Sequence, residues 1–342
     1  MTKHHSEQDD LAERLRLKIA AYHDTALLYA AVTLGLPEAM EGRTLTAEAL
    51  AAELGLSARH LHRLLRGLVS LGICTERPDG SFTLTPQGRC LLPGSPSRLR
   101  EKVQIVVRQY WQPWAKLAAA VETGTPGFEK VFGANVSDWR RDHAEAGAVF
   151  DSYLAHETLA QAPAIIPALD LSGVRRVADI GGGYGGLLAA ILKANPHPAG
   201  ILFDRPHRLE AALPFLQSQG VAARVERIGG DLLTAIPVEA DLYLLNGVLQ
   251  QWDDAGARTL LSNCRKAMPE GARLAVIERL MPERAADDPA AIMLDLHMMV
   301  ITGGRVRSRE DFAKLLSESG LTLTKLAPAP SGPTVITAVA AA

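Results

Sequence analysis

Residues 177–186, VADIGGGYGG, place a carboxylate before a glycine-rich turn, as in a nucleotide-binding loop. Gly181, Gly183 and Gly186 match the pattern G-x-G-x-x-G. An apolar segment typical of a buried strand precedes the turn, and a segment with helical apolar spacing follows it. Asp204 ends the next predicted strand, where a carboxylate can accept hydrogen bonds from ribose hydroxyls. This order of elements predicts a nucleotide site.

Two further acidic residues indicate which kind of nucleotide the site binds. Asp179 stands directly before the glycines, where its charge would repel a pyrophosphate but attract the sulfonium and ammonium groups of S-adenosylmethionine. Asp231, in IGGDLL, closes the next strand and is placed to meet an adenine amino group. We therefore expect S-adenosylmethionine and not a dinucleotide. Helix capping or solvation of the three acids is the alternative interpretation.

The elements that must position these acids alternate along residues 167–342. Strand-like segments such as RRVADI, AGILFD and DLYLLNGVL are separated by segments with helical spacing, such as RLEAALPFLQSQG. Strands that alternate with helices indicate a parallel, doubly wound sheet of the Rossmann-like α/β class. The carboxyl ends of such strands share one edge of the sheet, so the three acids are expected to lie together.

Residues 1–100 predict a different, mainly helical domain. Residues 11–36 have apolar positions at helical spacing, Thr46 and Ser57 are placed to cap two further helices, and Pro78-Asp79-Gly80 predicts a hairpin turn. Two helices followed by a hairpin indicate a winged helix. A winged helix raises the possibility of DNA binding, but 12 Lys/Arg against 11 Asp/Glu leave no basic excess.

Residues 101–166 are predicted to be a helical connector that is rich in aromatic side chains. Such a concentration is explained equally by packing between domains and by one wall of a pocket for a flat ligand. The aromatic residues of this segment are Tyr110, Trp111, Trp114, Phe128, Phe132, Trp139, Phe150 and Tyr153.

The composition excludes several classes of partner. The net charge is −2, with 36 basic and 38 acidic residues, so no global basic field favours nucleic acid or membrane. No apolar run is long enough to span a membrane, and the polar start MTKHHSEQDD lacks the core of a signal peptide. Three cysteines without metal-type spacing predict reduced thiols in a cytoplasmic protein without a metal site.

With these motifs in view, the sequence resembles the two-domain S-adenosylmethionine-dependent O-methyltransferases of the caffeic-acid type, in their bacterial secondary-metabolite branch. The resemblance runs over nearly the whole chain and rests on ADIGGGYGG, LFDRPH, RIGGDLL, LLNGVLQQWDD, NCRKAMPEGARLAVIERLMP and MLDLHMMVITGGRVRSREDF. It implies a homodimer formed through the N-terminal winged-helix dimerisation domain, and a small aromatic molecule as substrate.

The resemblance also implies roles for individual residues. Asp179, Gly181 and Gly183 would line the methionine end of the cofactor, and Asp204 would hold the ribose. The adenine would be flanked by Asp231 and Leu232. Other implied cofactor contacts are Asn246 and Trp252, and implied substrate contacts are Phe150, Leu154, His297 and Met298.

One departure from the family pattern concerns the catalytic base. Relatives carry Leu-His-Asp-Trp where this chain has LQQW, so Gln250 replaces the histidine that takes the proton of the substrate. A glutamate that often supports this histidine is replaced by Val306, whereas Glu278 matches the other supporting acid. An amide does not accept a proton near neutral pH. We therefore expect methyl transfer to depend mainly on proximity.

Other side chains are candidates for the missing proton acceptor. His297 is one, although a structural role in the pocket wall is the alternative. His156 and Glu157 lie on the predicted helix that carries Phe150 and Leu154, and they are further candidates near the substrate.

Two functions compete with methyl transfer. Some base-less relatives keep the cofactor but catalyse hydroxylation, decarboxylation or pericyclic reactions. A winged helix joined to a nucleotide-binding fold is also compatible with a ligand-sensing DNA-binding regulator.

Overall fold

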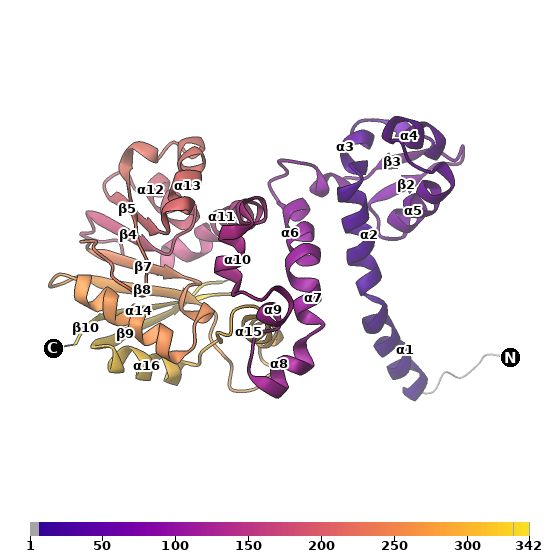
Figure 1. The fold of residues 1–342 in the computed structure, drawn as a ribbon. Helices are drawn as coiled ribbons and strands as arrows, with labels where there is room; N and C mark the ends of the chain where they lie inside the picture. Colours follow the sequence, from indigo (N-terminus) through magenta and orange to yellow (C-terminus); the bar gives the residue numbers. More distant parts are fainter. Residues whose placement is uncertain (1–6, 331, 342) are drawn as a thin grey trace. The chain divides into compact units, whose positions relative to one another are not determined.

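The computed structural model describes residues 7–330 and 332–341, and it divides into two compact units, Met1–Gln109 and Tyr110–Ala342 (Figure 1). Residues 101–109 of the predicted connector belong to the first unit, and its remainder belongs to the second. No helix in the described part of the chain is long and apolar enough to cross a membrane.

The first unit has the predicted order of helices followed by a hairpin. Residues 11–36 do not form one helix, because the chain turns at Ala21 and again at Leu34-Gly35. The elements are α1 (Glu7–Ala20), α2 (Tyr22–Thr33), α3 (Leu36–Met40), β1 (Thr44–Leu45), α4 (Ala47–Leu54), α5 (Ala58–Ser70), β2 (Cys74–Glu76), β3 (Phe82–Leu84), η1 (Gly88–Leu91) and α6 (Leu99–Ile105).

Local capping explains the short helices of this unit. The Thr46 hydroxyl accepts a hydrogen bond from the Ala49 amide, and Gly55 ends α4 at a φ of 67°. Ser57 precedes α5 as predicted, but it is not a side-chain cap, because its hydroxyl pairs with the His60 ring instead. The small sheet has the order β1-β3-β2.

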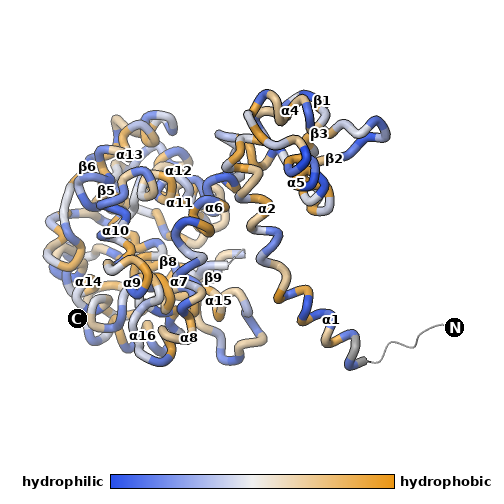
Figure 2. Tube along the Cα trace, turned by 45° about the vertical axis from the view of Figure 1, so that its right-hand side comes forward, coloured by the Kyte–Doolittle hydropathy of each residue, from blue (hydrophilic) through white to orange (hydrophobic). Residues whose placement is uncertain are grey.

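The apolar face of α5 packs onto the small sheet, but α1 and the start of α2 leave large apolar side chains in solvent. Figure 2 shows these hydrophobic positions between hydrophilic ones along the two helices. The exposed residues are Leu11, Leu15, Leu17, Ile19 and Tyr22.

The second unit begins with short helices that precede a seven-stranded sheet. The π-helix η2 (Val106–Tyr110) spans the boundary between the units. The helices are α7 (Trp111–Trp114), α8 (Leu117–Thr123), α9 (Gly127–Phe132), α10 (Val136–Asp142), α11 (Ala144–Ile165), η3 (Ile166–Ala168), α12 (Gly186–Ala194), α13 (Pro206–Ser218), η4 (Ala222–Arg224), η5 (Leu249–Gln251), α14 (Asp254–Ala267), α15 (Pro289–Ile301) and α16 (Arg309–Glu318).

The sheet has the strand order β6-β5-β4-β7-β8-β10-β9, with the first five strands parallel. Strand β10 runs antiparallel to both of its neighbours, β8 and β9, and this arrangement was not predicted from the sequence. Strand β7 also ends at Asn246, so the predicted strand DLYLLNGVL is wrong in its last residues. The strands are β4 (Arg176–Ile180), β5 (Ala199–Asp204), β6 (Val225–Gly229), β7 (Leu242–Asn246), β8 (Arg273–Glu278), β9 (Leu321–Pro328) and β10 (Thr334–Ala340).

Alternating side chains of the sheet fill a separate apolar core on each face. Leu242 and Leu244 of β7 pack with α11, α12 and α13, whereas Tyr243 and Leu245 pack with α14 and α16. Figure 1 shows these helices in layers above and below the strands. Both faces of the inner strands are covered, which explains why β4, β5, β7 and β8 are mainly apolar, whereas the edge strand β6 is largely exposed.

Candidate active site

The glycine loop connects β4 to α12 and has the backbone conformation that the motif predicts. Gly181 and Gly183 have φ values of 72° and 58°, in the left-handed region that disfavours other residues. A Cβ atom on Gly186 would collide with the Ala155 carbonyl oxygen, so this glycine permits close packing of α12 against α11. The loop therefore brings main-chain atoms to the carboxyl edge of the sheet.

Asp179 lies beneath this loop and is only 1% exposed. Its Oδ1 atom has no hydrogen-bond partner among the described residues. Burial, together with the charge of Asp204, raises the pKa of Asp179 to about 7. An unpaired buried carboxylate oxygen is unfavourable unless a cation or a donor reaches it. The ammonium group of S-adenosylmethionine fits this requirement.

Asp204 ends the neighbouring strand and is fixed in place by the main chain. Its Oδ2 accepts a hydrogen bond from the Gly183 amide at 2.8 Å, and its Oδ1 accepts one from the Arg205 amide at 2.7 Å. The Arg208 guanidinium lies 3.6 Å from Oδ1. The carboxylate is thus oriented at the end of the glycine loop, where the sequence predicted a ribose.

The next segment contributes a side chain that flanks the glycines. The Leu232 and Val248 side chains lie 3.5 and 3.2 Å from the position that a Cβ atom would take on Gly181. Asp231, in contrast, is exposed, and its Oδ1 accepts a hydrogen bond from the Leu233 amide at 2.9 Å. Leu232 therefore lies at the glycine loop, whereas the Asp231 carboxylate bonds to the turn that follows β6.

The segment 246–254 follows β7 at the same edge of the sheet and carries Gln250, the residue predicted to stand at the position of the usual base. Half-buried Asn246 ends the strand, and Gly247 turns the chain at a φ of 64°. The backbone N–H of Gln250, and not its side chain, donates to Glu278 Oε1 at 2.9 Å. The side chain of Gln251 turns back and donates to the Gly247 carbonyl at 2.8 Å.

Arg307 holds this segment from beneath and is fully buried. Its Nη1 donates to the Leu249 carbonyl at 2.9 Å, and its Nη2 donates to the Trp252 carbonyl and to Asp254 Oδ1, both also at 2.9 Å. A Cβ atom on Gly304 would collide with the Gln250 carbonyl oxygen. The GGRVRS segment therefore fixes the backbone of the Gln250 loop, a role that sequence reasoning missed.

Glu278 and Val306 contribute to the same support. Glu278 is 2% exposed, and burial raises its pKa to about 7 although the Gln250 and Leu249 amides and Arg307 oppose this shift. Its Oε2 has no partner among the described residues. The Val306 side chain is buried, and its amide donates to Asp295 Oδ1 at 2.8 Å.

His297, on α15, lies against two of the predicted aromatic residues. The indole of Trp114 is stacked at 26° to the imidazole, and the Tyr110 ring meets it edge-on with centroids 4.6 Å apart. Trp114 Nε1 donates to His297 Nδ1 at 3.2 Å. Met298, the next residue, is 8% exposed. This cluster was not predicted, because its members are far apart in sequence.

The residues of helix α11 that were predicted to contact the substrate lie in different surroundings. Phe150 stacks under the Arg140 guanidinium at 3.3 Å, and Leu154 is 44% exposed. His156 packs edge-on against Phe215 of α13, with ring centroids 5.4 Å apart. Burial raises the pKa of the Tyr153 phenol, and the charge and hydrogen bond of Glu157 raise it further. The two candidate histidines, His156 and His297, therefore belong to different clusters.

A buried charge network that the sequence did not predict lies between Phe150 and Asp204. Arg140 donates to the Tyr110 hydroxyl at 3.2 Å, and Asp151 pairs with Arg208 at 3.2 Å. Arg208 in turn lies beside Asp204. Burial raises the pKa of Asp151 to about 6, and the neighbouring Asp204 also raises it.

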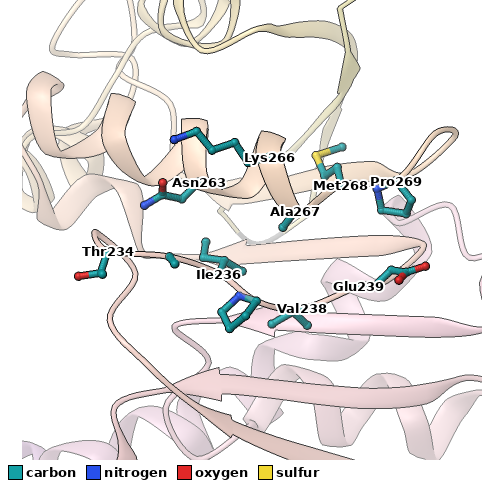
Figure 3. A pocket seen from close by; sticks show the side chains of 11 residues that line it. Thr234, Ile236, Val238, Glu239, Asn263, Lys266, Ala267, Met268 and Pro269 are labelled. Carbon is teal, nitrogen blue, oxygen red and sulfur yellow. The ribbon is translucent and has the colours of Figure 1, made fainter.

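A separate hollow of about 870 Å³ lies between the loop after β6 and the end of α14 (Figure 3). Glu239 and Met268 in its lining precede β7 and β8. It therefore opens at the amino ends of these strands, opposite the glycine loop, and is not the cofactor site. No group of three or more potential metal ligands occurs among residues 7–330 and 332–341.

A parallel sheet with a glycine loop, two buried acids at adjacent strand ends and a flanking aromatic cluster defines an S-adenosylmethionine-binding transferase. Comparison with known proteins agrees. Residues 114–322 match the O-methyltransferase domain, and residues 18–94 match the O-methyltransferase dimerisation domain. The chain belongs to the S-adenosylmethionine-dependent O-methyltransferase family, whose solved members include complexes with S-adenosylmethionine and S-adenosylhomocysteine.

Individual relatives cover nearly the whole chain. Phenazine O-methyltransferase PhzM of Lysobacter antibioticus is 36% identical, over 96% of each chain. The structure of the mitomycin 7-O-methyltransferase MmcR superimposes with a TM-score of 0.90 at 32% identity, over 98% of this chain and 99% of the other. Aclacinomycin 10-hydroxylase RdmB of Streptomyces purpurascens is 34% identical, over 86% of this chain and 80% of its own.

Proposed function

We propose that this methyltransferase acts on a hydroxyl or nitrogen of a small, flat aromatic metabolite, and that positioning supplies most of its rate. The observation that carries the proposal is the rigid support of Gln250 at the place of the family's base. Glu278, Arg307 and Gly304 all hold that segment, yet the side chain it presents cannot take a proton. The similarity to a phenazine and a mitomycin O-methyltransferase supports an aromatic substrate.

The residues at the strand ends suit each part of the cofactor, from its methionine end to its adenine. S-adenosylmethionine supplies a methyl group on a sulfonium, which is already a good leaving group. Asp179 offers its buried oxygen to the ammonium group, Gly181 and Gly183 allow close approach, and Asp204 accepts from the ribose hydroxyls. Leu232 covers the glycine loop. Trp252 and Asp231 complete the proposed adenine side, and Asn246 is proposed to lie near the cofactor.

The absence of a general base restricts which substrate groups can serve as the nucleophile. A simple phenol has a pKa near 10, so only about one molecule in a thousand is ionised at pH 7. A general base contributes about 10²–10⁴-fold, and its loss is tolerable when the hydroxyl is acidic or the nucleophile is a nitrogen. Alignment of the two reactants is worth roughly 7–11 kcal/mol, which is enough to drive the transfer from such a nucleophile.

The substrate surface is proposed to include Phe150, Leu154 and Glu157 of α11, together with His297 and Met298 of α15. Phe150 is the most strongly supported of these, because the Arg140 guanidinium holds its ring in place. Glu278 is proposed as a positioning residue for Gln250. His156 packs against Phe215, and we assign it a structural role.

The test is transfer of labelled methyl groups from S-adenosylmethionine to a panel of hydroxyquinones, hydroxyphenazines, N-heterocycles and simple phenols. We expect label in acidic hydroxyl or nitrogen acceptors and little in simple phenols. Calorimetry run in parallel establishes that the cofactor binds. Tight cofactor binding without transfer to any member of the panel would contradict the proposal.

A second candidate function is a reaction that uses the cofactor without transferring its methyl group. The similarity to aclacinomycin 10-hydroxylase RdmB favours it, because that protein is named as a hydroxylase and is 34% identical to this chain. Formation of S-adenosylhomocysteine in proportion to product distinguishes the two functions. Product formed without S-adenosylhomocysteine would establish the second.

The match to the dimerisation domain supports a homodimer formed through the first unit. The exposed apolar side chains of α1 and α2 are the proposed contact surface, since leaving them in water is unfavourable. A biosynthetic enzyme with unpaired cysteines also fits the cytoplasm.

A further inference from the structure

The guanidinium of Arg208 lies between two buried carboxylates. Its Nη1 is 3.6 Å from Oδ1 of Asp204, and its Nη2 is 3.2 Å from Oδ1 of Asp151. Asp204 ends β5 just before α13, which carries Arg208, whereas Asp151 belongs to α11 and is distant in the chain. The planar fork of an arginine suits such a double contact, because each terminal nitrogen can face a different acid. Arg208 thus joins the proposed ribose acid to the helix that carries Phe150.

Arg208 offsets repulsion among buried acids. Burial raises the pKa values of Asp151 and Asp179, and the charge of Asp204 raises both of them further. Burial disfavours the charge of the guanidinium, but Asp151 and Asp204 outweigh this effect and raise the pKa of Arg208 above its ordinary value. Without Arg208, the carboxylates of Asp151 and Asp204 would repel each other in a buried setting, which is unfavourable.

Helix α11 also meets the glycine loop by packing. The Ala155 carbonyl oxygen lies only 2.4 Å from the position that a Cβ atom would take on Gly186. The Tyr184 side chain of the loop is buried in the same apolar core as Ala155. Burial raises the pKa of the Tyr184 phenol, and the charge of Asp151 raises it further. Packing and charge therefore both connect this helix to the proposed cofactor site.

We propose that Arg208 is a positioning residue that holds Asp204 in place for the ribose hydroxyls, and that Asp151 links α11 to the occupied cofactor site through the same guanidinium. This inference rests on the proposed role of Asp204 and not on the identity of the substrate. Ribose hydroxyls that donate to Asp204 share its charge with the guanidinium, which strengthens the attraction of Arg208 for Asp151. Cofactor binding should therefore hold α11, and with it Phe150, more firmly.

Calorimetry tests the role of Arg208 with S-adenosylhomocysteine and its 2′,3′-dideoxy analogue, which lacks both ribose hydroxyls. We expect wild type to bind the natural compound at least about tenfold more tightly, and Arg208→Met to lose most of this preference. Arg208→Lys, which keeps the charge, should retain part of it. Adding Asp151→Asn to Arg208→Met should restore part of it, because one of the two repelling acids is then neutral. Arg176→Met, which breaks an exposed pair with Glu226, is the control.

Two results of this experiment would overturn the inference. Equal weakening of both ligands in Arg208→Met, without recovery on addition of Asp151→Asn, would make Arg208 a structural residue only. Equal binding of both ligands by the wild-type protein would show that the ribose hydroxyls do not depend on Asp204. Neither measurement involves methyl transfer, so a failure of the proposed function is recognised separately, by the absence of transfer to the acceptor panel.

Hydrogen exchange measured by mass spectrometry tests the link to α11. We expect saturating S-adenosylhomocysteine to slow amide exchange within residues 144–165 of the wild-type protein by about fivefold or more, and to slow it much less in Asp151→Asn. The glycine loop, residues 181–186, should be protected in both proteins and so confirms that the ligand is bound. Equal protection of α11 in the two proteins would overturn the link.

Discussion

The proposed contribution of Asp179 to cofactor binding opposes its contribution to the stability of the fold. Its pKa, raised to about 7, means that the folded protein holds a proton that the unfolded chain releases near pH 4. Stability attributable to this group therefore falls as pH rises from about 4 to 7 and stays low above that. A bound cation would reverse this effect, because it favours the ionised carboxylate.

Asp179→Asn should therefore separate stability from function. We expect the variant without cofactor to unfold at a higher temperature than wild type at pH 8, by a free energy on the order of a few kcal/mol, with a smaller difference at pH 5. Affinity for S-adenosylmethionine should fall at least about a hundredfold. Calorimetry and thermal unfolding provide both values. Unchanged cofactor affinity would show that Asp179 does not contact the ammonium group.

Gln250→His should restore a base at a site whose support is intact. We expect a rate increase on the order of 10²-fold for weakly acidic phenols and little change for acidic hydroxyquinones, which are already ionised. Gln250→Asn is the matched control. An equal increase for both groups of substrates would contradict the idea that deprotonation limits the reaction of simple phenols.

The sequence predicted residues whose roles follow from a local motif. It did not predict residues that make contacts between distant parts of the chain. Gly181, Gly183, Asp179 and Asp204 follow from one motif and the strand that comes next. The contacts of Arg307 with Leu249 and Trp252 join distant parts of the chain, and no spacing rule indicates them. Asp231 follows β6, but its carboxylate accepts a hydrogen bond from its own turn, and its predicted contact with the adenine stays a prediction.

At the scale of elements, the conformation of the loop after β7 depends on Gly304, which precedes Arg307 in the chain. Gly304→Ala would place a methyl group against the Gln250 carbonyl, so the loop must shift. We expect kcat to fall about tenfold or more while cofactor affinity changes little, since displacement near the reacting atoms is costly. The control is Gly67→Ala in α5, where the added methyl group meets only the flexible Leu27 side chain of α2.

The outcome that would contradict this account is wild-type kcat in Gly304→Ala with the fold intact. A matching loss in Gly67→Ala would instead attribute the effect to general instability.

The inner parallel strands were predicted because both of their faces are covered, which makes a strand such as β5 the short apolar run AGILFD. The antiparallel pair β9 and β10 was missed, since β9 has a half-exposed pattern without a following helix. The cap at Thr46 was predicted correctly. Ser57 instead pairs with the His60 ring, because its hydroxyl can bond either to a backbone amide of the helix or to a nearby side chain, and the residue type alone does not decide between them.

At the scale of the whole molecule, the exposed residues of α1 test the proposed dimer. The double variant Leu15→Glu with Ile19→Glu replaces two side chains that are 60% and 67% exposed, so the first unit should still fold. We expect light scattering to report a dimer for wild type and a 36.7 kDa monomer for the variant. Val121→Glu, at a 69% exposed site in the second unit, is the control.

A double variant that stays dimeric would place the interface elsewhere. If Val121→Glu also dissociates the protein, α1 is not the specific contact.

The central claim is that no side chain takes the proton of the substrate, and the pH dependence of single-turnover methyl transfer tests it most directly. With a series of hydroxylated aromatics of different acidity, we expect the inflection of the rate profile to move with the pKa of each substrate. An inflection fixed near pH 7 for every substrate, and abolished in Glu278→Gln, would instead reveal a base within the protein and contradict the account.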